Sequence, residues 1–181
     1  KHLCNPDARV LAIIGCGVQG RYHAVAMSRV LPLLSVVKIS DQRQSSVDSF
    51  ITEVSQRIPA VHIEVCRTPE DAIRDADLVI TATGKLLDPI FRCAWVKPGA
   101  LILPVHTQGW DSATLTDVDK LVVDDWAQFS SYAGEFYHAL PDRPYAETGE
   151  IVAGLKPGRE RPTERIVKFN TALAVHDILM A

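Results

Sequence analysis

Residues 10–20 are Val10-Leu11-Ala12-Ile13-Ile14-Gly15-Cys16-Gly17-Val18-Gln19-Gly20, and this stretch decides the fold. Its first five residues form a continuous apolar run, which is typical of a strand covered on both faces in a parallel sheet. Three glycines follow in a G-x-G-x-x-G pattern, and helical spacing of apolar residues follows the glycines. The stretch therefore predicts a buried strand, a tight turn and a helix, in that order.

The rest of the chain continues this alternation of apolar runs and helical segments. Further strands are predicted at residues 36–39, 61–65, 78–80, 101–103, 121–123 and 166–169. Strands that alternate with helices over short connections form a parallel sheet with helices on both faces. We therefore expect one α/β domain over residues 1–181, a Rossmann-type doubly wound, mostly parallel sheet of six to seven strands. Residues 137–162 are rich in proline and glycine and are predicted to form a long surface excursion.

The composition excludes several classes of function. The net charge is −3 and the 19 basic residues are scattered, which argues against nucleic-acid binding. No apolar run approaches the roughly 20 residues that a membrane helix needs. The four cysteines lie far apart, and the histidines show no metal-ligand spacing with one another. We therefore expect a cytoplasmic protein without a disulfide framework and without a metal site.

The glycine turn is suited to binding the pyrophosphate of a dinucleotide. Gly15 permits the tight turn, Gly17 lets a pyrophosphate approach the backbone, and Gly20 lets the helix pack closely on the strand. The N-terminus of the helix adds free N–H groups and the positive end of the helix dipole. The alternative is a glycine-rich connection that binds nothing, but its position between a buried strand and a helix favours binding.

Asp41 ends the second predicted strand, 21 residues after Gly20. An acidic residue about 20 residues beyond the glycines binds the ribose hydroxyls of the adenosine in this fold. Its charge also repels a 2′-phosphate, so the spacing favours NAD over NADP. Gln42 and Arg43 follow, and an arginine here offers the alternative of a contact to that phosphate. A solvated acid at a strand end is the other interpretation of Asp41.

Two further loops follow the fourth and fifth predicted strands. The first contains Thr81, Ala82 and Thr83, and the second contains Val105, His106 and Thr107. Ligands of such sheets bind beyond the carboxyl ends of the strands, so we expect both loops to face the cofactor. His106 is a titratable side chain placed for chemistry near a nicotinamide. The alternative for His106 is a plain hydrogen bond to a loop carbonyl.

Several segments together resemble the ornithine cyclodeaminase/mu-crystallin family. The resemblance is carried by residues 15–20, 80–83, 95–100, 147–159 and 169–177, and it spans nearly the whole chain. It implies a nucleotide-binding Rossmann domain. The dinucleotide contacts that it implies fall on Val18, Gln19, Asp41, Thr81, Ala82, Thr83, Val105, His106, Thr107 and Asn170.

The resemblance also implies a second domain, built mainly from an N-terminal segment. In the family that domain binds the amino-acid substrate and forms the dimer, so we expect a homodimer for the full-length protein. The 181-residue chain has no counterpart of that segment. We therefore expect this chain to bind the dinucleotide and to turn over no amino or imino acid alone.

One position departs from the family pattern. Cyclodeaminases carry an acid/base Asp three residues beyond the end of the fifth strand, and this place, counted from Val105, is Gln108. An amide takes up no proton at neutral pH, and Asp111 lies three residues further on. His106 and Thr107 also replace two glycines. Ornithine cyclisation is therefore not expected.

These observations favour an NAD-dependent oxidoreductase that acts on an amino or imino acid. Hydride would pass between the α-carbon and the nicotinamide, so the cofactor carries the difficult step. One alternative is a cyclodeaminase-type lyase, in which NAD is reduced and reoxidised within one turnover. The other alternative is a dinucleotide-binding protein without catalysis.

Overall fold

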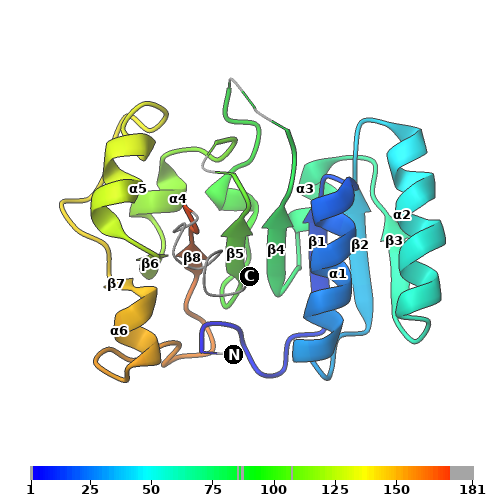
Figure 1. Ribbon diagram of the computed structural model, residues 1–181, viewed down its shortest axis with the longest axis horizontal. Helices are drawn as coiled ribbons and strands as arrows, with labels where there is room; N and C mark the ends of the chain where they lie inside the picture. The colour runs from blue at the N-terminus through cyan, green and yellow to red at the C-terminus, as the bar shows by residue number, and fades with distance from the viewer. Residues whose placement is uncertain (1, 85, 87, 107, 172–181) are drawn as a thin grey trace, which may run out of the picture.

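A computed structural model of the protein describes residues 2–84, 86, 88–106 and 108–171. In this part of the chain one sheet contains eight strands, all paired in parallel, in the order β3-β2-β1-β4-β5-β8-β6-β7. Figure 1 shows the strands side by side. The strands are β1 (Val10–Ile14), β2 (Val36–Ser40), β3 (His62–Val65), β4 (Leu78–Thr81), β5 (Leu101–Pro104), β6 (Lys120–Val123), β7 (Ala146–Glu147) and β8 (Ile166–Lys168).

Helices cover both faces of the sheet. Alternate residues of β1 point to opposite faces, so Leu11 and Ile13 belong to one apolar core while Ala12 and Ile14 belong to the other. The first core also contains residues of α1, α2 and α6, and the second contains residues of α3, α4 and α5. These helices are α1 (Val18–Val30), α2 (Gln44–Arg57), α3 (Pro69–Ile73), α4 (Ala113–Thr116), α5 (Trp126–Ala133) and α6 (Thr148–Val152), and a 3-10 turn, η1, spans Cys93–Trp95.

The prediction of a Rossmann-type α/β fold is confirmed, and the strand count is higher than the six to seven expected. The additional strand is β7, which lies in the segment predicted to be a surface excursion. That prediction is wrong for residues 145–152: Tyr145 N–H donates to the Leu121 carbonyl, and Ala146 and Ile151 are buried. A two-residue strand leaves no readable period in the sequence, because alternation needs at least four residues to be recognised.

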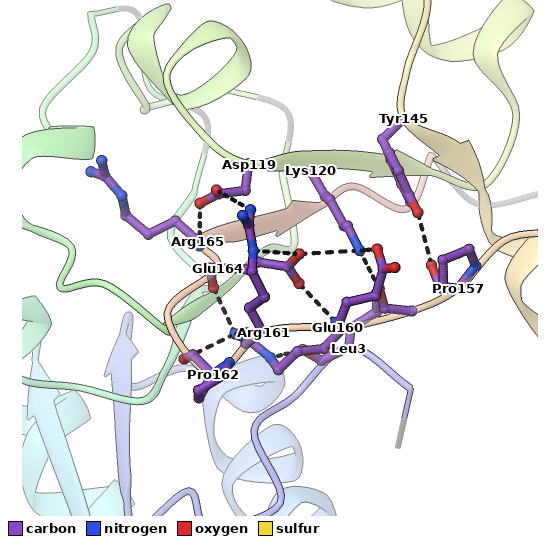
Figure 2. A network of polar contacts seen from close by, with 12 residues as sticks. Leu3, Asp119, Lys120, Tyr145, Pro157, Glu160, Arg161, Pro162, Glu164 and Arg165 are labelled. Carbon is purple, nitrogen blue, oxygen red and sulfur yellow. Dashed lines mark hydrogen bonds and ion pairs between the residues drawn. The ribbon is translucent and has the colours of Figure 1, made fainter.

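A polar network holds the segment before β8 against the amino ends of β6 and β8 (Figure 2). The Lys120 ammonium donates to the Gly158 carbonyl at 2.6 Å and to Glu160 Oε2 at 2.7 Å, and it lies 3.4 Å from Glu164 Oε1. Arg159 joins this segment to the start of the chain, because its Nε donates to the Leu3 carbonyl at 2.9 Å. The network lies at the amino ends of the strands, whereas the glycine turn lies at the carboxyl end of β1.

Candidate functional site

The glycine turn lies where the order of the strands reverses. The chain runs from β1 outward to β2 and β3, and then returns to place β4 on the other side of β1. Ligands of open α/β sheets bind beyond the carboxyl ends of the strands at such a reversal, because the two flanking loops separate there. The loop after β1 and the loop after β4 are therefore the expected walls of a site.

A cavity of about 500 Å³ lies at this point. It is walled by the loops that follow β1, β2, β3 and β4, which all leave the same edge of the sheet. Its size suits a small-molecule or cofactor site. Its lining residues are Ile14, Gly15, Gly17, Ser40, Asp41, Gln42, Arg43, Arg67, Pro69, Ala82, Thr83, Gly84, Leu86 and Ile90.

Each of the three glycines of the turn occupies its position for a different structural reason. Gly15 has a φ of +102°, and a Cβ there would lie 2.5 Å from the Ala82 carbonyl oxygen. A Cβ on Gly20 would lie 2.1 Å from the Gly15 oxygen, so Gly20 allows the helix to pack on the turn. A Cβ on Gly17 would meet nothing within 4 Å. The open space at Gly17 is the cavity itself, so that glycine keeps room for a ligand.

The N-terminus of α1 is left available to an anion. Gly17 is the N-cap and supplies no side chain, and the first turn contains no acidic residue. The first N–H groups of a helix have no intrahelical acceptor, and the helix dipole places partial positive charge there. A phosphate placed in the open space beside Gly17 would therefore meet both the N–H donors and the dipole.

Asp41 is bound into the turn. Its Oδ2 accepts a 2.8 Å hydrogen bond from the Cys16 N–H, and its Oδ1 accepts one of 2.8 Å from the Arg43 N–H. The Asp41 side chain is 10% exposed, and Arg43 Nε lies 3.9 Å from Oδ1. A carboxylate has about four lone-pair sites, so two bonds leave acceptor capacity on both oxygens for the hydroxyls of a ligand.

The wall beyond Asp41 comes from the loop after β3. Arg67 and Pro69 line the cavity there. The loop is fixed at both ends, because Cys66 N–H donates to the Ile39 carbonyl at 2.8 Å and Thr68 Oγ1 caps α3 by accepting from Asp71 N–H at 3.1 Å. Neither Arg67 nor Pro69 was predicted from the sequence as a site residue. Their position directly after a strand was the available signal.

The opposite wall comes from the loop after β4. Ala82 and Thr83 were predicted, whereas Gly84, Leu86 and Ile90 were not, and no pattern in the sequence marks the last two. This loop is joined to the loop after β5, because the N–H groups of Ile90 and Phe91 donate to the Gly109 carbonyl at 2.9 and 2.8 Å. The side chains of Leu86 and Ile90 give this end of the cavity an apolar lining.

The remaining predicted residues that the structure describes do not line the cavity. The Thr81 side chain is buried and accepts a 3.1 Å hydrogen bond from Trp110 Nε1, so it supports the loop from behind. Thr107 lies outside the described residues. Of the others, Val18 and Gln19 are exposed and Gly20 is buried, all three in the first turn of α1. Val105 is half-buried after β5, His106 is exposed in the same loop, and Asn170 is exposed after β8.

The position expected to hold an acid/base carboxylate is occupied by an amide. Gln108 is 7% exposed, so it is buried in the loop after β5. Asp111 lies three residues further on, and its Oδ1 accepts from the Cys93 N–H at 3.1 Å and from Thr114 Oγ1 at 3.0 Å. Asp111 therefore holds the loop together.

Nucleophilic thiol chemistry at the turn is also disfavoured. Burial, together with the nearby Asp41 carboxylate, raises the pKa of Cys16 to about 12, so this thiol stays protonated at neutral pH. Among the described residues no three His, Cys, Asp or Glu side chains are grouped to hold a metal ion, and no helix is long and apolar enough to cross a membrane.

This geometry agrees with comparisons to known proteins. The model of the ornithine cyclodeaminase/mu-crystallin family matches residues 1–181. The chain belongs to this family. The sequence is 35% identical over 183 residues to the nodulation efficiency protein NfeD of Rhizobium meliloti, covering 98% of this chain and 55% of that protein.

Two solved structures of family relatives share the fold. The Δ1-pyrroline-2-carboxylate reductase of Thermococcus litoralis, in complex with NADH and L-proline, superposes with a TM-score of 0.81 at 26% identity, covering 97% of this chain and 57% of that one. An archaeal alanine dehydrogenase dimer with bound NAD gives a TM-score of 0.77 at 28% identity, covering 98% and 56%. The chain therefore spans a little over half the length of these relatives.

Proposed function

We propose that this chain is the NAD-binding domain of an oxidoreductase that transfers hydride at the α-carbon of an amino or imino acid. The observation that carries the proposal is the glycine turn: Gly17 leaves open space at the N-terminus of α1, and Asp41 is bound to the same turn. The relatives support it, since one binds NADH and proline and another binds NAD.

The residues of the cavity fit the parts of the dinucleotide. The N–H groups of Val18 and Gln19 and the open face of Gly17 would hold the pyrophosphate, and Asp41 would accept from the hydroxyls of the adenosine ribose. Ala82 and Thr83 would flank the nicotinamide half, with Val105, His106 and Asn170 further along the carboxyl ends of the strands. When bound, the nicotinamide supplies hydride acceptor and donor chemistry at its C4.

Asp41 also supports a preference for NAD over NADP. Its side chain is largely buried and its charge is fixed beside the turn by two backbone N–H donors. A 2′-phosphate would bring negative charge against this carboxylate in a partly buried setting, where like charges repel strongly. Arg43 Nε lies 3.9 Å from Asp41 Oδ1, so its charge is directed toward this carboxylate.

Gln108 favours a reductase or dehydrogenase over a lyase. Cyclisation of a diamino acid needs a group that takes up and returns a proton at the substrate amine, and an amide has no such capacity. The hydrogen bonds of Asp111 to Cys93 N–H and Thr114 Oγ1 support a structural role for that carboxylate.

The substrate side of the protein is proposed from the relatives. We infer that residues binding the amino or imino acid lie outside these 181 residues, and that the full-length protein is a homodimer. The archaeal alanine dehydrogenase, which is a dimer, supports this inference. Free cysteines at positions 4, 16, 66 and 93 support a reducing, cytoplasmic location.

Calorimetric titration of the chain with NAD and NADP tests the cofactor proposal directly. We expect saturable NAD binding that is lost in Gly17→Val, and weaker binding of NADP. Absence of NAD binding by the folded wild-type chain would overturn the proposal. For the full-length protein, NADH oxidation with Δ1-pyrroline-2-carboxylate, or with pyruvate and ammonia, tests the reaction class.

A further inference from the structure

The end of the cavity beyond Asp41 is formed by two neighbouring loops. Gln42 and Arg43 follow β2, Arg67 and Pro69 follow β3, and all four line the cavity. The strands are parallel neighbours, with Ile39 opposite Val65, so both loops leave the sheet side by side. A ligand that extends from the glycine turn past Asp41 therefore passes between these loops.

Two arginines line the cavity, Arg43 and Arg67, and of these Arg67 is the one whose side chain has no partner among the described residues. No described residue gives its side chain a hydrogen bond or an ion pair, and the residue is exposed. In contrast, Arg21 pairs with Glu53 at 3.0 Å, and Arg43 lies 3.9 Å from Asp41. The backbone around Arg67 is nevertheless fixed at Cys66 and Thr68. The Arg67 guanidinium is thus available to a ligand, and the loop that carries it is held in place by backbone hydrogen bonds on either side.

We propose that Arg67 packs its guanidinium plane against the adenine ring, with Pro69 adding apolar contact at the same wall. This inference rests on the proposed NAD site. With the pyrophosphate at Gly17 and the ribose at Asp41, the base is the next unit along the ligand, and Arg67 and Pro69 are the next residues along the wall. Arginine stacks on aromatic rings by its planar, weakly hydrated cation.

The alternative role for an arginine in this region is a contact to a 2′-phosphate. That role is disfavoured because Asp41 stands at the ribose, and a 2′-phosphate would lie against its carboxylate. Stacking on the base needs no negative charge on the ligand. It therefore acts equally on every ligand that carries the adenosine half, whether or not the nicotinamide is present.

The test compares Arg67→Ala and Arg67→Lys with wild type by titration with NAD, ADP-ribose and nicotinamide mononucleotide. Loss of a cation–π contact costs about 2- to 30-fold in affinity, and we expect a loss in that range for both NAD and ADP-ribose in Arg67→Ala. Nicotinamide mononucleotide should bind the variant and wild type equally. Arg67→Lys keeps the charge without the plane, so most of the loss should remain.

Arg29→Ala is the matched control. Arg29 is an exposed arginine in the last turn of α1, at the far end of that helix from the glycine turn. Its removal changes the net charge as Arg67→Ala does, and we expect wild-type affinity for all three ligands. Both variants should unfold at the wild-type temperature, because both side chains are exposed.

Two results would overturn the role of Arg67 while leaving the NAD site intact. The first is wild-type affinity of Arg67→Ala for ADP-ribose, with wild type itself binding. The second is a pair of findings: Arg67→Lys binds NAD with wild-type affinity, and Arg67→Ala loses more affinity for NADP than for NAD. Together these would show that Arg67 contacts a phosphate. A wild-type chain that binds neither NAD nor ADP-ribose would instead overturn the proposed function.

Discussion

The backbone N–H of Cys16 donates a 2.8 Å hydrogen bond to Asp41 Oδ2, so the glycine turn after β1 and the end of β2 form one unit. The carboxylate proposed to bind the ribose therefore also positions the turn proposed to bind the pyrophosphate. A change at Asp41 acts on both, and an informative variant must keep the bond to Cys16 while removing the charge.

Asp41→Asn is that variant. The amide oxygen can still accept from Cys16 N–H, while the charge that repels a 2′-phosphate is gone. We expect the ratio of NADP to NAD affinity to rise about 10-fold, which corresponds to about 1.4 kcal/mol. Titration with both cofactors at low and high salt measures the ratio, and Asp41→Ala, which loses the acceptor as well, should weaken both. Equal NAD and NADP affinity in wild type would contradict the role of the Asp41 charge.

Substitutions at Gly17 and Gly20 should separate the effect on NAD binding from the effect on stability. Gly17→Val places its side chain in open space, so we expect a folded chain of nearly wild-type thermal stability that does not bind NAD. In Gly20→Ala the new Cβ would lie 2.1 Å from the Gly15 oxygen, and we expect a destabilisation of about 1–3 kcal/mol from overpacking. Thermal unfolding and NAD titration of both variants measure the contrast. A Gly17→Val chain that binds NAD normally would show that the pyrophosphate does not approach this position.

The sequence predicted those parts of the site whose chemistry leaves a local pattern. The glycines and Asp41 follow from spacing, because the turn, the helix N-terminus and the next strand end lie at set intervals in this fold. Arg67 lies in a polar loop after an exposed strand, where an arginine has no distinctive pattern. Lys120 was not predicted to be buried or paired, since its buried partner Glu164 lies far along the chain and no local pattern links the two. Such pairings depend on tertiary structure.

The buried pair of Lys120 and Glu164 should contribute strongly to stability (Figure 2). The two side chains are 5% and 2% exposed, so removal of one partner leaves a charge that water does not reach. We expect Lys120→Met to lower the free energy of unfolding by about 3–5 kcal/mol. Arg74→Ala, which breaks an exposed pair with Glu70, should cost less than about 1 kcal/mol. Urea denaturation measures both, and equal costs would contradict the burial argument.

Stability should also depend on pH through Glu164. Burial alone would raise its pKa, but the N–H groups of Glu160 and Arg161 and the Lys120 ammonium outweigh burial and lower it below the usual 4.5. The contribution of the Glu164 carboxylate to the free energy of unfolding is therefore complete above the pKa that the group has in the unfolded state. It is lost as the pH falls through the lower pKa of the folded state. We expect the stability difference between wild type and Glu164→Gln to be constant from about pH 7 to 5 and to shrink below about pH 4.5. A difference that grows toward acid would contradict this sign.

Gln108 decides between the oxidoreductase and the lyase. Without a group of suitable pKa, proton transfer at a substrate amine is slower by about 10²–10⁴-fold, so we expect the full-length protein to release no proline or ammonia from ornithine with catalytic NAD. It should consume NADH stoichiometrically with a cyclic imine, or with a keto acid and an amine.

Asp111→Asn should lower stability without altering the pH profile of this reaction, because Asp111 accepts hydrogen bonds from Cys93 N–H and Thr114 Oγ1. Ammonia release from ornithine at about 1 s⁻¹ or faster would restore the lyase. In that case loss of ammonia release in Asp111→Asn, with NAD binding unchanged, would identify Asp111 as the proton carrier.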